Sequence, residues 1–85
     1  MNFGDALAFL KEGKKVTRIG WNGKEMFIYY VPENSYKAQT DAARSTFGED
    51  VPYGAYLAIK TAQNNVVPWL ASQTDVLAED WQEVE

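Results

Sequence analysis

The chain has 85 residues, of which 46% are hydrophobic, 14% aromatic and 24% charged. This length fits one domain, residues 1–85, and the apolar content excludes a disordered chain. The sequence has neither Cys nor His, which excludes disulfides, zinc sites built on those residues, and thiolate or imidazole catalysis. The net charge of −4 argues against DNA, RNA or an anionic membrane as the partner. Without a membrane-length apolar run or a recognisable secretion signal, we expect a cytoplasmic protein.

The charge is distributed unevenly along the chain. Residues 1–24 carry five basic and two acidic side chains, whereas residues 49–85 carry one basic and seven acidic side chains. Opposite charge at the two ends favours contact between them, either within one chain or between copies. Two solvated faces are nevertheless the favoured interpretation, because surface ion pairs contribute little to stability.

The N-terminal segment has the pattern of an amphipathic helix. Its apolar side chains recur on one helical stripe, at Phe3, Ala6, Leu7 and Leu10. Asn2 is a suitable N-cap, and Gly13 can end the helix in a left-handed turn.

Five short segments have the composition of strands. In chain order they are residues 15–19, 26–31, 56–60, 66–67 and, as an edge strand, 81–84. Asn22-Gly23 predicts a hairpin between the first two, because both residues tolerate positive φ. Ser72 is a suitable cap for a short helix that runs to about Ala78. The sequence therefore predicts an α+β fold: an antiparallel, meandering four- to five-stranded sheet with an N-terminal helix and a short helix near the C-terminus.

Residues 33–54 show no sustained periodicity. The segment is rich in Ser, Thr, Asn, Asp, Gly and Pro, which indicates a long loop in which residues 38–44 could form a helical turn. A loop of this length in a small domain is more often functional or flexible than idle.

The sequence holds little that catalysis could use. Acid–base chemistry would fall to carboxylates, Lys or Tyr, and Asp75, Glu79 and Asp80 form one acidic cluster. Two carboxylates at helical spacing could hold a hard ion such as Mg²⁺. A capping residue followed by a solvated acidic face is the favoured interpretation. We therefore expect no enzymatic activity, no cofactor and no metal site.

Aromatic residues give a stronger functional signal. The chain has three Trp, five Tyr and four Phe, more than a small core usually needs, and several flank turns. Trp21 precedes Asn-Gly, and Trp69 follows Val-Val-Pro. Aromatic faces stack on nucleobases while a nearby cation meets a phosphate, so the pattern favours binding of a small nucleotide. Packing in the core is the alternative for each single aromatic.

Two segments carry a resemblance to a known family. The first is Gly20-Trp21-Asn22-Gly23-Lys24, and the second is Val67-Pro68-Trp69-Leu70-Ala71-Ser72-Gln73-Thr74-Asp75. With matching residues in segments 2–18, 26–27 and 77–81, they cover about half of the chain. The sequence resembles the second type of Thoeris anti-defence sponges, small proteins of phages and prophages.

The resemblance implies a phage anti-defence protein that acts in the cytoplasm of the infected bacterial host. It implies binding and sequestration, without cleavage, of a cyclic nucleotide immune signal: a cyclic ADP-ribose isomer and, in some relatives, cyclic oligonucleotides. It also implies a homo-oligomer, expected to be a tetramer, with pockets between protomers. The alternative function is a protein-binding module that inhibits a host defence protein directly.

The resemblance also implies which residues contact the ligand. The leading contacts are Trp21, Asn22, Trp69, Ser72, Thr74 and Asp75, with the Asp75 carboxylate accepting from ribose hydroxyls. Phe27 or Tyr29 is expected to add a second stacking face. Arg18 and Lys24 are the expected phosphate contacts.

Overall fold

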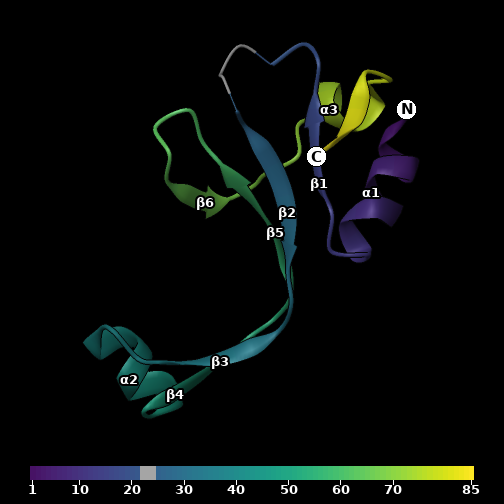
Figure 1. Cartoon of the computed structure of the whole chain (residues 1–85). Helices are drawn as coiled ribbons and strands as arrows, with labels where there is room; N and C mark the ends of the chain where they lie inside the picture. Colours follow the sequence, from purple (N-terminus) through teal and green to yellow (C-terminus); the bar gives the residue numbers. More distant parts are fainter. Residues whose placement is uncertain (22–24) are drawn as a thin grey trace.

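The computed structural model of the chain describes residues 1–21 and 25–85. Three helices and seven strands follow one another within these residues (Figure 1). They are α1 (Phe3–Lys11), β1 (Lys15–Arg18), β2 (Phe27–Val31), β3 (Asn34–Lys37), α2 (Asp41–Phe47), β4 (Asp50–Tyr53), β5 (Tyr56–Lys60), β6 (Val66–Pro68), α3 (Gln73–Leu77) and β7 (Trp81–Val84). No helix in this part of the chain is long and apolar enough to cross a membrane.

The main sheet has five antiparallel strands in the order β6-β5-β2-β1-β7. Ile28 lies opposite Val16 on one side and opposite Ile59 on the other, which aligns the three central strands. The structure thus confirms the α+β fold and the edge position of residues 81–84. It contradicts a simple meander, because the chain leaves β6 at one edge, forms α3 and pairs β7 with β1 at the opposite edge. The Asn22-Gly23 hairpin prediction lies outside the described residues.

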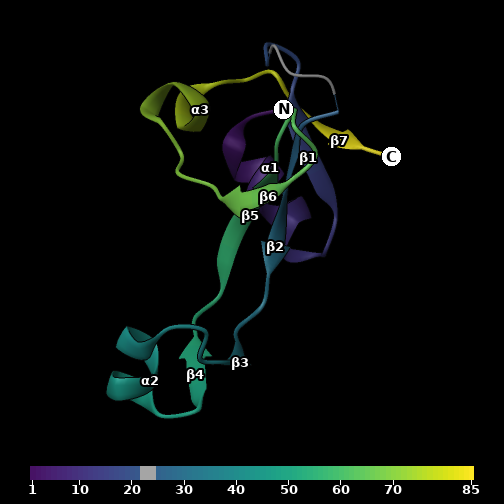
Figure 2. The same cartoon turned by 90° about the vertical axis from the view of Figure 1, so that its left-hand side faces the viewer.

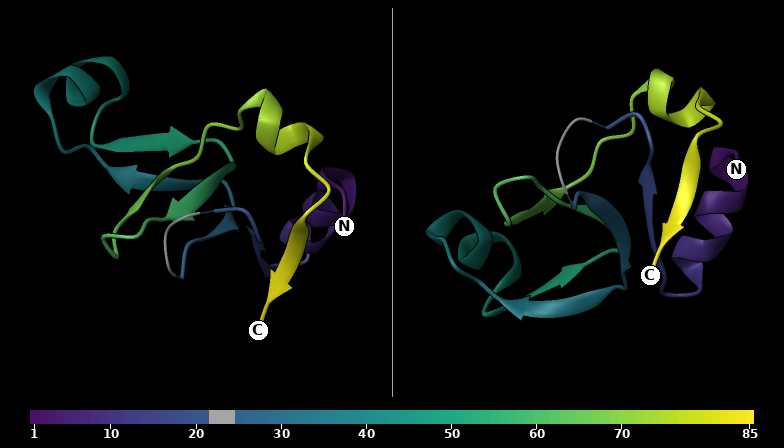
Figure 3. Two further views of the ribbon diagram at one scale, coloured as in Figure 1. Left: turned by 90° about the horizontal axis from the view of Figure 1, so that it is seen from above. Right: turned by 45° about the horizontal axis from the view of Figure 1, so that its top comes forward.

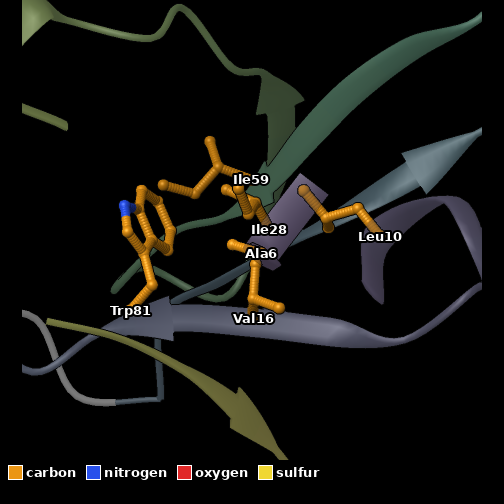
Figure 4. Packing of buried hydrophobic residues seen from close by; sticks show 6 residues of the cluster. All are labelled: Ala6, Leu10, Val16, Ile28, Ile59 and Trp81. Carbon is orange, nitrogen blue, oxygen red and sulfur yellow. The ribbon is translucent and has the colours of Figure 1, made fainter. Parts of the chain in front are cut away.

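Helix α1 covers one face of this sheet and completes the core (Figure 2). Side chains of a strand alternate between the two faces, so aligned residues of neighbouring strands point the same way. Ala6 and Leu10 of α1 pack with Val16, Ile28 and other buried residues on this face (Figure 4). The predicted helix limits are confirmed: the Asn2 side chain accepts a hydrogen bond from a backbone amide of the first turn, and Gly13 has a φ of 89°.

Residues 34–53 form an arm and not the loop predicted from the sequence. Strand β3 pairs with β4, α2 packs on β4, and together they project away from the main sheet (Figures 1 and 3). The helix is Asp41–Phe47, capped by Thr40, so it begins three residues later than the helical turn predicted for residues 38–44 and overlaps it. Within the arm only Ala38 and Val51 are buried, which explains why its sequence shows no hydrophobic period.

We predict that Leu10→Ala lowers the free energy of unfolding by about 2–5 kcal/mol, because Leu10 is completely buried between α1 and the sheet. Lys11→Ala, on the exposed side of the same helix, should change it by less than about 0.5 kcal/mol. Urea unfolding followed by circular dichroism measures both variants. Equal losses in the two variants would contradict this placement of the core.

Candidate ligand-binding site

Residues from two distant segments of the sequence meet at one end of the main sheet. Arg18 ends β1, Trp21 follows three residues later, and Asp75 lies in α3 (Figure 1). The pairing of β7 with β1 places Trp81 opposite Arg18. The tertiary structure therefore brings together candidate residues that are more than fifty positions apart.

Trp81 is the centre of an aromatic cluster at this end. Its ring centroid lies 5.4 Å from Trp21, 5.4 Å from Phe3 and 5.9 Å from Trp69, and both tryptophan pairs are T-shaped. Trp81 is 1% exposed, whereas Trp21 and Trp69 are only partly buried. Each of these two rings therefore packs against the core and keeps part of its surface accessible, so a core role and a binding role are compatible.

An ion-pair network joins this cluster to α3 and β7. The Arg18 guanidinium donates to Asp75 Oδ1 and to Asp80 Oδ1, each over 2.8 Å. Asp75 Oδ1 also accepts from Trp21 Nε1 at 3.3 Å, and Asp80 Oδ2 accepts from the Gly20 amide at 2.9 Å. The basic and acidic ends thus meet within one chain, so the favoured interpretation of two solvated faces is wrong for these side chains. The assignment of Arg18 to a ligand phosphate stays a prediction, because here it binds two carboxylates.

The ion-pair network shifts the pKa values of Asp75, Asp80 and Arg18. Partial burial raises the pKa of Asp75, but hydrogen bonds from its neighbours, Arg18 above all, outweigh that effect and leave the pKa below its ordinary value. The hydrogen bond from Arg18 likewise lowers the pKa of Asp80. The same contacts, that with Asp80 first, raise the pKa of Arg18. Both carboxylates are therefore ionised at neutral pH, and the three side chains together carry one negative charge.

The remaining candidates of α3 lie at its exposed beginning. Ser72 is the N-cap, as predicted, and its Oγ accepts from the Asp75 amide at 3.1 Å. Thr74 is exposed in the first turn. Asn22 and Lys24 lie outside the described residues. Within residues 1–21 and 25–85, no three acidic side chains are grouped so as to hold a metal ion.

Phe27 and Tyr29 lie on the other face of the sheet. They flank Ile28, which is buried under α1, so their side chains point away from the helix. Their rings are 6.0 Å apart, and the ammonium groups of Lys15 and Lys60 lie 5.0 and 6.0 Å from the Phe27 ring. A single protomer thus does not bring Phe27 or Tyr29 together with the two tryptophans.

A cavity of about 600 Å³ opens on this second face, and its lining includes Lys15, Phe27 and Lys60. Sequence reasoning missed the two lysines as neighbours of Phe27, because the register of the three strands is set by long-range pairing. It also missed Asp80 and Trp81 as organisers of the tryptophan cluster. The uneven charge pointed to a contact there, but not to the residues that make it.

The lowered pKa values predict acid-sensitive stability. The Asp75 carboxylate stabilises the fold fully above its unfolded pKa near 4, and this contribution is lost as the pH falls through the lower folded value. Wild type should therefore lose more free energy of unfolding between pH 6 and pH 2.5 than Asp75→Asn does, as measured by urea titrations. The control Asp50→Asn, in an exposed ion pair with Lys37, should keep the wild-type loss. The same loss in Asp75→Asn as in wild type would contradict the network.

Comparison with known proteins covers nearly the whole chain. The family model described as Tad2-like, the Thoeris anti-defense 2-like domain, matches residues 1–84. A curated protein named Thoeris anti-defense 2, from Bacillus phage SP01, is 42% identical over 81 residues, which are 95% of this chain and 91% of that relative. The match therefore includes the tryptophan cluster, the ion-pair network and the arm. This chain belongs to the Thoeris anti-defense 2-like family.

Proposed function

We propose that this protein is a phage anti-defence protein that binds a cyclic nucleotide immune signal, a cyclic ADP-ribose isomer, and holds it without cleavage in the host cytoplasm. The observation that carries the proposal is the meeting of Trp21, Trp69 and Asp75 around Trp81. Membership of the family supports the anti-defence role.

Trp21 and Trp69 supply the stacking surfaces for the adenine of the signal. Both rings are held by T-shaped contacts with the buried Trp81, so they lose little freedom when a ligand binds. Stacking of a base on one aromatic side chain contributes about 1–3 kcal/mol. Rigid, partly exposed tryptophans therefore suit a flat nucleobase.

Asp75 supplies the polar contact. Arg18 and Trp21 both donate to its Oδ1, and we assign the second oxygen, Oδ2, to a ribose hydroxyl. Because the carboxylate is ionised, it is a strong acceptor for such a donor. The hydroxyls of Ser72 and Thr74 at the exposed start of α3, together with Lys24, are the groups that we assign to the phosphates.

The same network supports sequestration over cleavage. Asp75 and Asp80 both bind Arg18, so the acidic cluster that could have held a catalytic metal is already partly neutralised by a cation of the chain. A metal poised for hydrolysis needs several carboxylates turned toward one ion, whereas Asp75 and Asp80 are both turned toward Arg18. We therefore propose storage of the intact signal as the mode of action.

We further propose that the protein is a homo-oligomer, a tetramer, in which a second copy completes each pocket. Leu70 and Leu77 beside the site are 90% and 76% exposed, and Phe47 on the arm is 55% exposed. Large apolar side chains this exposed, at the site and on the arm, are candidates for interaction surfaces. The arm adds a second reason, since a two-stranded ribbon with so small a core is marginally stable alone.

The same exposed side chains also favour a second candidate function, a protein-binding module that inhibits a host defence protein directly. Leu70 and Leu77 could contact such a protein as readily as a second copy. The two functions differ in whether a nucleotide is depleted from solution.

Trp69→Ala should weaken binding of the signal, because it removes one stacking surface. The expected loss is about 5- to 150-fold in dissociation constant. The protein is mixed with a panel of cyclic ADP-ribose isomers and cyclic dinucleotides, and the free ligand is filtered off. The protein is then denatured, and the released compound is identified by chromatography.

Trp69→Phe is the matched control. It keeps an aromatic ring against Phe3 and Trp81 and should retain most of the affinity. Release of the intact compound from wild type is the expected result. An altered product would indicate an enzyme, and no depletion by wild type would contradict the proposed function.

Native mass spectrometry should give a tetramer for wild type at micromolar concentration and a smaller species for Phe47→Ser, which removes an exposed apolar ring from the arm. Ser45→Ala, exposed on the same helix, should leave the mass of the assembly unchanged. A monomeric wild type would refute the assembly. A stoichiometric host protein bound without any nucleotide would favour the protein-binding module instead.

A further inference from the structure

Asp80 holds three consecutive residues that lead to Trp21. Its Oδ1 accepts from Arg18 Nε at 2.8 Å, and its carbonyl accepts from the Ile19 amide at 3.1 Å. Its Oδ2 accepts from the Gly20 amide at 2.9 Å. One residue thus holds the Arg18 side chain and the backbone amides of Ile19 and Gly20, just before Trp21.

The Trp21 ring is positioned by a backbone turn and by a side-chain hydrogen bond. The Trp21 amide donates to the Arg18 carbonyl at 3.2 Å, which closes a turn over the segment that Asp80 holds. The indole Nε1 then donates to Asp75. The direction of the ring is therefore set by the turn at one end and by Asp75 at the other.

Asp80 also helps to position Asp75, because Arg18 binds both carboxylates. The side chains of Arg18, Asp75 and Asp80 are only 17%, 15% and 32% exposed. A planar guanidinium held by one carboxylate presents its remaining donors in a fixed direction. Asp80 thereby fixes the donor that holds Asp75.

Gly20 also indicates that the Asp80 carboxylate packs closely against the backbone. A Cβ atom at Gly20 would lie 3.0 Å from Asp80 Oδ2, which is closer than such contacts normally are. Only glycine at this position lets the carboxylate reach the backbone amide without displacement. Sequence and geometry therefore agree on a close approach at this point.

We propose that Asp80 is a positioning residue of the binding site: it does not contact the ligand, but through Arg18 and the Gly20 amide it holds Trp21 and Asp75 in the geometry that binds it. The ligand part of this inference rests on the proposed function. The geometric part does not, so the two are tested separately.

The first test needs no ligand. The T-shaped contact of Trp21 with Trp81 at 5.4 Å gives coupled near-ultraviolet circular dichroism, which is isolated as the difference between wild type and Trp21→Phe. In an Asp80→Asn background, the same difference should shrink by at least about half, because the segment that leads to Trp21 is held less firmly. In an Asp50→Asn background, which changes a residue of the arm, the difference spectrum should keep its wild-type size. An undiminished difference in Asp80→Asn would overturn the proposal.

The second test measures affinity for the cyclic ADP-ribose isomers of the panel. Asp80→Asn should weaken binding by about tenfold, the effect typical of losing a charged hydrogen bond. Asp80→Glu restores the charge that pairs with Arg18 and should recover part of the affinity. Affinity of Asp80→Asn within about twofold of wild type would overturn the proposal.

Two further results of these experiments need separate interpretation. If wild type binds no compound of the panel, the proposed function fails, and the dichroism alone decides whether Asp80 positions Trp21. If Asp80→Asn does not fold, Gly20→Ala tests the same contact with both charges kept, because its Cβ would lie 3.0 Å from Asp80 Oδ2 and the carboxylate must give way by a few tenths of an ångström. Gly20→Ala should then change the spectrum and the affinity in the same direction but by less than is predicted for Asp80→Asn, and wild-type values for both would overturn the inference.

Discussion

The pairing of β7 with β1 is the constraint on which the rest of the structure depends. It joins Lys15–Arg18 to Trp81–Val84 along the whole length of both strands. This pairing brings an acidic C-terminal segment to a basic N-terminal one and places the largest buried side chain, Trp81, at the end of the core. The tryptophan cluster and the Arg18 network both depend on it, because α3 must cross the end of the sheet to bring the chain to β7.

Local patterns account for what could be predicted from the sequence. The stripe of α1, the cap at Ser72 and the central strands depend on residues close together in the chain, and they are where the patterns placed them. The partner of β7 and the face occupied by Phe27 depend on long-range pairing, which no local period encodes. The arm was missed for another reason: its short strands are almost wholly exposed, so they lack the alternation that identifies a strand.

The candidate site residues also differ in how well the sequence predicted their positions. Trp21 and Trp69 were nominated by their places beside turns and, with Asp75, by a family resemblance. These three residues meet in one place, whereas Phe27 and Tyr29 lie on the other face of the sheet. Arg18, nominated as a contact for a phosphate, is bound by two carboxylates in the single protomer. A pattern of residue types identifies groups that suit a ligand, but it does not reveal which of those groups the fold uses to hold itself together.

The arm leaves the sheet after Val31 and returns at Tyr56, and these two residues lie directly opposite each other in the β2–β5 ladder. The ladder therefore closes without any help from the twenty-four residues between them. Substitutions, insertions and deletions in the arm leave the register of the main sheet intact, since lengthening such a segment adds only a small closure entropy. The arm is therefore structurally separable: its length and surface can change without moving the tryptophan cluster, which is built from α1, β7 and the segments around Trp21 and Trp69.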